Sequence, residues 1–168
     1  MNIILIGFMG SGKTVVGKAL AERLGRAFFD MDSIIEEEQG MTVAEIFRTK
    51  GEKFFRLWEA ELARRMGEER DAVIACGGGV VLNRENLENL SRNGIVVCLD
   101  ADLDTLVNRL KDMDDRPLLE GGETRKRVES LLAERQPFYD RIEFKVDTSG
   151  RSVDEVVDEI ADKLRARC

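Results

Sequence analysis

Short runs of apolar residues alternate along the chain with longer segments in which apolar residues recur every three or four positions. This alternation is typical of an α/β domain built around a mainly parallel sheet. Most of the short runs are continuously apolar, as expected for parallel strands that are buried on both faces. Strands are predicted at residues 2–6, 27–29, 72–76, 95–99 and 144–146.

The apolar stripes and the end signals of the longer segments predict helices between these strands. Thr42 with Glu45, and Ser152 with Glu155, have the spacing of a capping box, in which two side chains bind free amides at a helix start. Residues 14–24 are predicted to form a helix that stops at Gly25, a frequent terminator. Its expected buried stripe consists of Val15, Val16, Ala19, Leu20 and Leu24.

Two further helical segments flank a region that contains a predicted loop. Residues 52–66 carry an apolar stripe formed by Phe55, Trp58, Leu62 and Met66. Residues 123–139 are expected to be helical until Pro137 ends or kinks the helix. The segment KDMDDRPLLEGG, residues 111–122, is charged and is broken by Pro117 and two glycines, so we expect a mobile loop there.

Length and charge narrow the possible functions. A chain of 168 residues can bury a sizeable core, and we expect one domain over residues 1–168. It has no run of 18 apolar residues, which argues against a membrane partner. A net charge of -7 without a dominant stripe of Lys and Arg argues against nucleic acid as a partner. Any anionic ligand must therefore be bound by a local site.

The cysteine and histidine counts exclude several kinds of chemistry. Cys76, Cys98 and Cys168 are too few and too scattered for a disulfide framework or a metal site, so we expect reduced thiols in a cytoplasmic protein. The first residues, MNIILIG, are too short and uncharged for a signal peptide. The chain has no histidine, which excludes Ser-His-Asp and Cys-His catalysis. Carboxylates, Arg, Lys and backbone amides must carry the chemistry.

The segment from residue 7 to residue 14 contains the most specific motif. Gly7, Gly12, Lys13 and Thr14 match G-x-x-x-x-G-K-[ST] directly after a predicted strand and before a predicted helix. In such a loop, backbone amides and the helix N-terminus bind phosphate oxygens, the lysine reaches the β- and γ-phosphates, and the hydroxyl ligates Mg²⁺. We therefore predict a nucleoside triphosphate site formed by Gly10, Ser11, Gly12, Lys13, Thr14 and Val15.

Paired carboxylates and a triple glycine follow two other predicted strands, and each has a purely structural alternative. Asp30 and Asp32 could serve different partners in the ligand crevice of the sheet, or an aspartate could cap a helix that starts at Ser33. No aspartate ends the strand at residues 72–76, so Asp30 would have to supply charge near a metal. Close backbone approach to a ligand or a flexible turn would equally explain Gly77, Gly78 and Gly79.

Several arginines are candidates for binding anions. Arg56 and Glu59 are three residues apart on a predicted helix, where they could form no more than an exposed ion pair. Two guanidinium groups on one carboxylate would be chemically sensible, because each binds both carboxylate oxygens and stays charged. The remaining candidates, which could instead be solvated surface charges, are Arg109, Arg116 and Arg135.

Together these motifs make the chain resemble the shikimate kinase family. The resemblance is carried, over nearly the whole chain, by the phosphate loop, DMD (30–32), FRLWE (55–59), GGG (77–79), DRPLL (115–119) and ERQPFY (134–139). It implies a three-layer α/β/α P-loop kinase fold with a five-stranded parallel sheet. A substrate-binding segment at about 32–66 and a lid at about 111–123 are also implied. The implied activity is phosphorylation of the 3-hydroxyl of shikimate by a monomer that uses ATP and Mg²⁺.

The resemblance also implies roles on the acceptor side of the site. Asp32 is implied to take substrate hydroxyls and is the candidate base. Arg56, oriented by Glu59, and Arg135 are implied to hold the substrate carboxylate. The triple glycine, Gly77 to Gly79, is implied to form a substrate-side loop in which Gly78 offers its amide.

On the nucleotide side, the resemblance places Asp30 near Mg²⁺ together with Thr14. Arg116 is implied to act from the lid on the transferring phosphoryl group, with Lys13. Arg109 and the loop at residues 148–151, which includes Arg151, fall where the family packs the adenine ring.

Other functions also fit a phosphate loop. A gluconate or nucleotide kinase of the same fold is one alternative, but gluconate kinases place a histidine after the aspartate of the second strand, and this chain has none. A nucleotide acceptor would need aromatic stacking, for which the acceptor-side segments offer only Phe54, Phe55 and Trp58. A guanine-nucleotide switch would carry N-K-x-D, which is missing.

Overall fold

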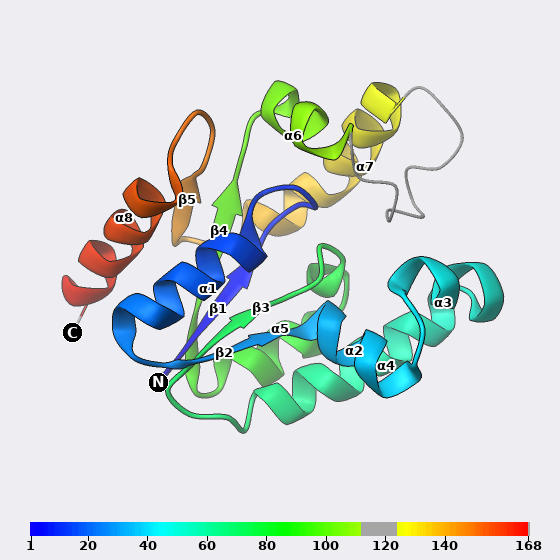
Figure 1. Ribbon diagram of the computed structural model, residues 1–168, viewed down its shortest axis with the longest axis horizontal. Coiled ribbons are helices and arrows are strands. Elements are labelled where there is room, and N and C mark those ends of the chain that lie inside the picture. The colour runs from blue at the N-terminus through cyan, green and yellow to red at the C-terminus, as the bar shows by residue number, and fades with distance from the viewer. Residues whose placement is uncertain (112–123, 168) are drawn as a thin grey trace.

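Within the part of the chain that the computed structural model describes, residues 1–111 and 124–167, five parallel strands form one central sheet (Figure 1). The order across the sheet is β2-β3-β1-β4-β5. The strands are β1 (Asn2–Ile6), β2 (Ala27–Asp30), β3 (Ala72–Ala75), β4 (Gly94–Asp100) and β5 (Lys145–Asp147). The predicted parallel sheet is confirmed, and β1 lies at its centre.

Helices cover both faces of the sheet. Successive side chains of β1 point to opposite faces and all are apolar or buried, so both faces need a covering layer. Ile3 and Leu5 pack in a cluster with α1 (Lys13–Leu24) and α8 (Val153–Arg165). Ile4 and Ile6 belong to a cluster on the other face. The elements on that side are α2 (Met31–Gln39), α3 (Val43–Lys50), α4 (Glu52–Met66), the 3₁₀ turn η1 (Val80–Leu82), α5 (Arg84–Ser91), α6 (Leu103–Leu110) and α7 (Thr124–Tyr139). The predicted three-layer α/β/α architecture is confirmed.

Two of the predicted helix starts are formed by capping boxes. The hydroxyl of Thr42 accepts from the amide of Glu45, and the Glu45 side chain accepts from the Thr42 amide, at the start of α3. Ser152 and Glu155 make the same reciprocal pair at the start of α8. None of the helices in residues 1–111 and 124–167 is long and apolar enough to cross a membrane.

Two details of the predicted helices are wrong. On α1, Val15 is 57% exposed and Leu24 is 36% exposed, because the helix packs against the sheet and α8 through a narrower stripe that includes Val16 and Leu20. Of the two outcomes predicted at Pro137, an end or a kink, the end is wrong, because α7 runs to Tyr139. A proline in the final turn removes only one of the few hydrogen bonds that remain there, so the helix tolerates it.

Two helices, α5 and α6, were not predicted, although each begins at a polar capping residue. The side chain of Asn83 accepts from the amide of Glu85 before α5. The side chain of Asp102 accepts from the amide of Thr105 before α6, at 2.7 Å. Several strand ends also differ by one residue from the prediction, so that Cys76 and Phe144 fall outside β3 and β5.

Candidate active site

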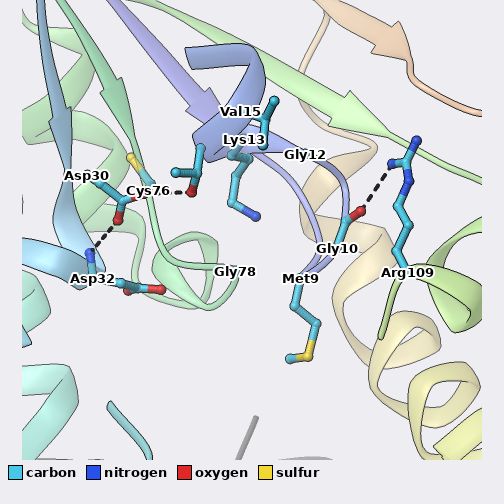
Figure 2. A pocket seen from close by; sticks show the side chains of 11 residues that line it. Met9, Gly10, Gly12, Lys13, Val15, Asp30, Asp32, Cys76, Gly78 and Arg109 are labelled. Carbon is cyan, nitrogen blue, oxygen red and sulfur yellow. Dashed lines mark hydrogen bonds between the residues drawn. The ribbon is translucent and has the colours of Figure 1, made fainter. Parts of the chain in front are cut away.

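The candidate active site lies at the carboxyl ends of β1, β2 and β3, the edge where parallel sheets of this kind bind ligands. β1 leads into the phosphate loop, β2 ends at Asp30, and β3 leads into the triple glycine. A cavity of about 240 Å³ opens between these segments (Figure 2). Its lining includes Lys13, Asp30, Asp32, Gly78 and Arg109.

The phosphate loop curls around its own lysine. Gly7, Gly10 and Gly12 have φ values of 144°, 81° and 95°, which residues with a Cβ rarely adopt. This backbone path brings Nζ of Lys13 to 3.0 Å from the carbonyl oxygens of both Gly7 and Phe8. Figure 2 shows the Lys13 side chain reaching into the cavity. The adjoining N-terminus of α1 adds free amides and a partial positive charge, so this end of the cavity suits an anion.

Asp30 caps a helix, as one reading of the sequence predicted, and its second carboxylate oxygen remains on the side of the cavity. Its Oδ1 accepts from the amides of Asp32 and Ser33 and so caps α2. Its Oδ2 accepts from the hydroxyl of Thr14 at 2.6 Å, across the cavity from β2 to the phosphate loop. Helix capping therefore holds the carboxylate in place while its second oxygen faces the predicted phosphate position.

The Thr14 and Asp30 pair fits the predicted Mg²⁺ position. Both side chains offer oxygen atoms, which this small, hard cation prefers. Among the residues that the structure describes, no cluster of three or more His, Cys, Asp or Glu side chains could hold a metal. Mg²⁺ in phosphate-binding proteins commonly takes only one or two protein ligands, and phosphate oxygens and waters complete its shell. Thr14 and Asp30 are the residues that would hold it.

Arg56 and Glu59 form a partly buried pair rather than the exposed pair that the spacing allowed. Nη1 of Arg56 donates to both carboxylate oxygens of Glu59, at 3.0 and 2.9 Å, and Glu59 is only 1% exposed. Nε and Nη2 of Arg56 donate to Glu52, at 3.2 and 3.0 Å. Burial raises the pKa of Glu59 to about 7, an effect that the positive charge of Arg56 opposes and the negative charge of Asp32 reinforces. Two carboxylates thus fix one guanidinium at the rim of the cleft.

The triple glycine is explained by close packing rather than by a flexible turn. A Cβ on Gly77 would lie 2.7 Å from Oδ1 of Asp32 and 3.0 Å from Oε1 of Glu59. A Cβ on Gly79 would lie 2.3 Å from Nη1 of Arg56. None of the three has a left-handed φ, the backbone conformation that would by itself call for glycine. The missing side chains allow charged groups to pack directly against the backbone.

Arg135 reaches the same loop from α7. The side chain is 4% exposed, and its guanidinium lies over the ring of Phe8 at 5.8 Å. A Cβ on Gly78 would lie 3.3 Å from Nη1 of Arg135 and 3.2 Å from the amide nitrogen of Met9. Arg135 is therefore not a solvated surface charge. The structure brings Asp32, Arg56 and Arg135 together around residues 77–79.

Arg109 and Arg151 border a second cavity of about 220 Å³, between α1 and the loop at residues 148–151. Arg109 donates to the carbonyl oxygen of Gly10 at 3.1 Å and to both side-chain and backbone oxygens of Thr148. Arg151 donates to the backbone oxygens of Asp147 and Glu155, both at 2.9 Å. These bonds fix the wall where the sequence predicts the adenine ring. Arg116 and most of the predicted lid, residues 112–123, lie outside the described residues.

Sequence reasoning assigned no role to several residues at this site. Glu52 was missed although it is one helical turn before Arg56, a spacing that signals an ion pair. Thr148 belongs to the loop predicted to border the adenine ring, but its own contacts were not predicted: it is 2% exposed and donates toward the backbone oxygens of Ser11 and Asp100. Tyr139 was part of a quoted motif, but its contact partner lies across the fold and could not be read from spacing.

Comparisons with known proteins agree with this arrangement. A sequence model of the family described as Shikimate kinase matches residues 9–165. The chain belongs to the shikimate kinase family. The shikimate kinase of Pelotomaculum thermopropionicum is 46% identical over 98% of this chain and 95% of its own length. That of Symbiobacterium thermophilum is 48% identical over 99% of this chain and 98% of its own length.

A solved structure of the family shows the same fold. The shikimate kinase from Acinetobacter baumannii, in complex with shikimate, superimposes with a TM-score of 0.94 and 34% sequence identity. The match covers 99% of this chain and 93% of that chain. Family membership and fold thus agree with a cleft that has a phosphate loop on one side and paired arginines on the other.

Proposed function

We propose that the chain transfers the γ-phosphoryl group of ATP to the 3-hydroxyl of shikimate. The observation that carries this proposal is the packing of Arg56 and Arg135 against the same glycine loop that borders the phosphate cavity. A triphosphate and a small carboxylic acid would therefore be held side by side in one cleft. Membership of the shikimate kinase family supports shikimate as the acid.

The acceptor is proposed to be anchored at one end and aligned at the other. Arg56 and Arg135 would bind the carboxylate, because guanidinium groups remain charged and match its geometry. Asp32 lines the cavity that also contains Lys13, so a hydroxyl bound to its carboxylate would face the terminal phosphate. Asp32 would hold this hydroxyl and accept its proton as phosphoryl transfer proceeds.

Charge neutralisation is proposed to come from the phosphate side. Backbone amides of residues 10–15 and the ammonium group of Lys13 would bind the phosphate oxygens, and Arg116 would add positive charge from the lid. Thr14 and Asp30 would hold Mg²⁺, which when bound neutralises phosphate charge. Arg109 and Arg151 would border the adenine ring. The protein takes little part in the covalent chemistry of phosphoryl transfer, so positioning of the two substrates must supply most of the rate enhancement.

The test is ADP release with ATP and Mg²⁺ in the presence of shikimate, quinate, gluconate or nucleoside monophosphates. Turnover that depends on shikimate supports the proposal, whereas turnover with another acceptor, or with none, contradicts it. In the same assay Arg56→Ala should raise KM for shikimate about a hundredfold, as loss of a charged hydrogen bond implies, with little change in KM for ATP.

Arg64→Ala is the matched control for Arg56→Ala. Arg64 lies on the same helix and also pairs with two glutamates, Glu61 and Glu68, but its side chain is 51% exposed, whereas that of Arg56 is 24% exposed. Its replacement should leave KM for shikimate unchanged. An unchanged KM in Arg56→Ala would mean that Arg56 does not hold the acceptor.

We also propose that the enzyme is a single-domain, cytoplasmic monomer. The described site residues belong to one chain and lie around the carboxyl edge of one sheet, so that a monomer can form this part of the site. Light scattering after size exclusion should give a mass near 19.0 kDa. A dimer mass would contradict the monomer.

A further inference from the structure

Tyr139 connects the triple glycine to the last turn of α7. Its hydroxyl donates to the carbonyl oxygen of Gly78 at 2.7 Å, and the side chain is 3% exposed. Burial raises the pKa of Tyr139, so the phenol keeps its proton and remains a donor at neutral pH. The positive charge of Arg135, which lies near the same hydroxyl, opposes this shift. One buried hydroxyl thus binds the glycine loop and lies near a predicted carboxylate anchor.

The hydrogen bond from Tyr139 restrains the peptide that joins Gly78 and Gly79. A planar trans peptide points its carbonyl and its amide in opposite directions, so holding the Gly78 oxygen also fixes the amide of Gly79. Glycine would otherwise allow this peptide plane to rotate with little steric resistance. Among the described residues, no group accepts a hydrogen bond from the amides of Gly78 or Gly79.

The loop is also close to both halves of the cleft. Gly78 approaches the backbone of the phosphate loop at Met9 and the guanidinium of Arg135, and Gly79 lies against Arg56. A rotation of the peptide that joins Gly78 and Gly79 would therefore move the amide of Gly79 relative to both arginines. The side chain that prevents this rotation is Tyr139.

We propose that Tyr139 is a positioning residue for the acceptor. Its hydroxyl holds the Gly78 peptide and the guanidinium of Arg135 in the orientation that receives the acceptor carboxylate. This role rests on the proposed function, because it takes shikimate as the acid that binds there. Tyr139 does not touch the reacting atoms. It sets the geometry of groups that bind the acceptor.

The test is Tyr139→Phe, which removes one oxygen and keeps the buried ring. The dissociation constant for shikimate, measured by calorimetry without nucleotide, should rise about tenfold, as expected when a buried carbonyl loses its donor. KM for shikimate should rise by a similar factor, while KM for ATP and kcat change less than about twofold. A hydroxyl that only stabilised the fold would lower Tm and leave shikimate binding unchanged, and that result would overturn the proposal.

Val128→Ala is the control for a general loss of stability. Val128 is fully buried on the same helix and packs in the same core cluster as Tyr139. Its truncation should lower Tm at least as much as Tyr139→Phe and leave the shikimate dissociation constant unchanged. If Val128→Ala weakened shikimate binding equally, the effect would belong to helix packing and the proposal would fail.

A third measurement tests whether the hydroxyl acts through Arg135. In the Arg135→Ala background, Tyr139→Phe should weaken shikimate binding by less than in the wild type, since one of the groups it positions is gone. Equal effects in both backgrounds would contradict the link to Arg135. Failure of the proposed function is distinguishable, because the wild type itself would then not bind shikimate.

Discussion

Each glycine after β3 leaves room for a different charged side chain. Gly77 faces Asp32 and Glu59, Gly78 faces Arg135, and Gly79 faces Arg56. The sequence identified the triple glycine but could not distinguish close approach from turn flexibility, because the neighbouring side chains come from three other helices. At the scale of single residues, the glycine motif therefore indicated where the site lies, and tertiary packing explains why glycine is needed there.

Gly79→Ala tests this packing. The added Cβ would lie 2.3 to 2.5 Å from three atoms of the Arg56 guanidinium, so the arginine must shift away from its position between Glu52 and Glu59. We expect the dissociation constant for shikimate to rise at least about tenfold while ATP binding stays unchanged. Calorimetric titration measures both constants.

Gly25→Ala is the control for Gly79→Ala. At this helix end a Cβ meets nothing within 4 Å, although the φ of 62° is strained for alanine. The variant should lose stability by roughly 1 kcal/mol and keep its shikimate affinity. Normal shikimate binding by Gly79→Ala would show that Arg56 can relocate without cost.

Glu59 should make stability depend on pH near neutrality. Burial raises its pKa in the folded chain from 4.5 to about 7. Between these two values the folded state holds more protons than the unfolded state, so the free energy of unfolding should fall as pH rises. Above about pH 7 both states are ionised and this contribution becomes constant. Urea unfolding from pH 5 to 8 measures it.

Glu59→Gln cannot ionise and provides the comparison. The unfolding free energy of the wild type minus that of Glu59→Gln should decrease as the pH rises toward 7. Above about pH 7 this difference should stay constant. Several other carboxylates, among them Glu45 and Glu155, have lowered pKa values and act only at more acidic pH. Parallel pH curves for the two proteins would show that Glu59 is ionised throughout.

At the scale of elements, sequence signals were reliable where they were local. Both capping boxes form, and the apolar stripe of α4 is buried at Phe55, Leu62 and Met66. The prediction failed where a helix depends on its surroundings: α5 and α6 are short, and their apolar residues are buried in the core cluster that they share with neighbouring helices. Pro137 likewise suggested an end to α7 that the tertiary context does not impose.

The capping box of α8 gives a prediction at this scale. Ser152→Ala removes the side-chain acceptor of the Glu155 amide and should destabilise the protein by about 1 kcal/mol. For a chain of this length that corresponds to a Tm decrease of roughly 2–4 °C. Differential scanning calorimetry measures the decrease.

Ser91→Ala is the matched control, since Ser91 is exposed, is not a helix cap and donates only to the backbone of Glu88. Its Tm should change by less than about 1 °C. Equal losses in Ser91→Ala and Ser152→Ala would mean that the reciprocal cap contributes nothing beyond an ordinary serine contact.

At the scale of the whole molecule, the parallel sheet explains why distant motifs meet. Every strand runs in the same direction, so the segments that follow β1, β2 and β3 emerge at one edge. The order of motifs along the chain was enough to predict this edge as the site. The convergence of Arg56 on α4 and Arg135 on α7 could not be predicted from spacing, because it depends on how both helices pack over one face.

The contact between Thr14 and Asp30 has a practical consequence for spectroscopy. If Thr14 and Asp30 hold Mg²⁺ as proposed, their oxygen atoms, 2.6 Å apart, should accept Mn²⁺ as well. The unpaired electrons of manganese would then broaden the NMR signals of bound shikimate according to its distance from the metal. The broadening would measure the separation between the proposed metal site and the acceptor.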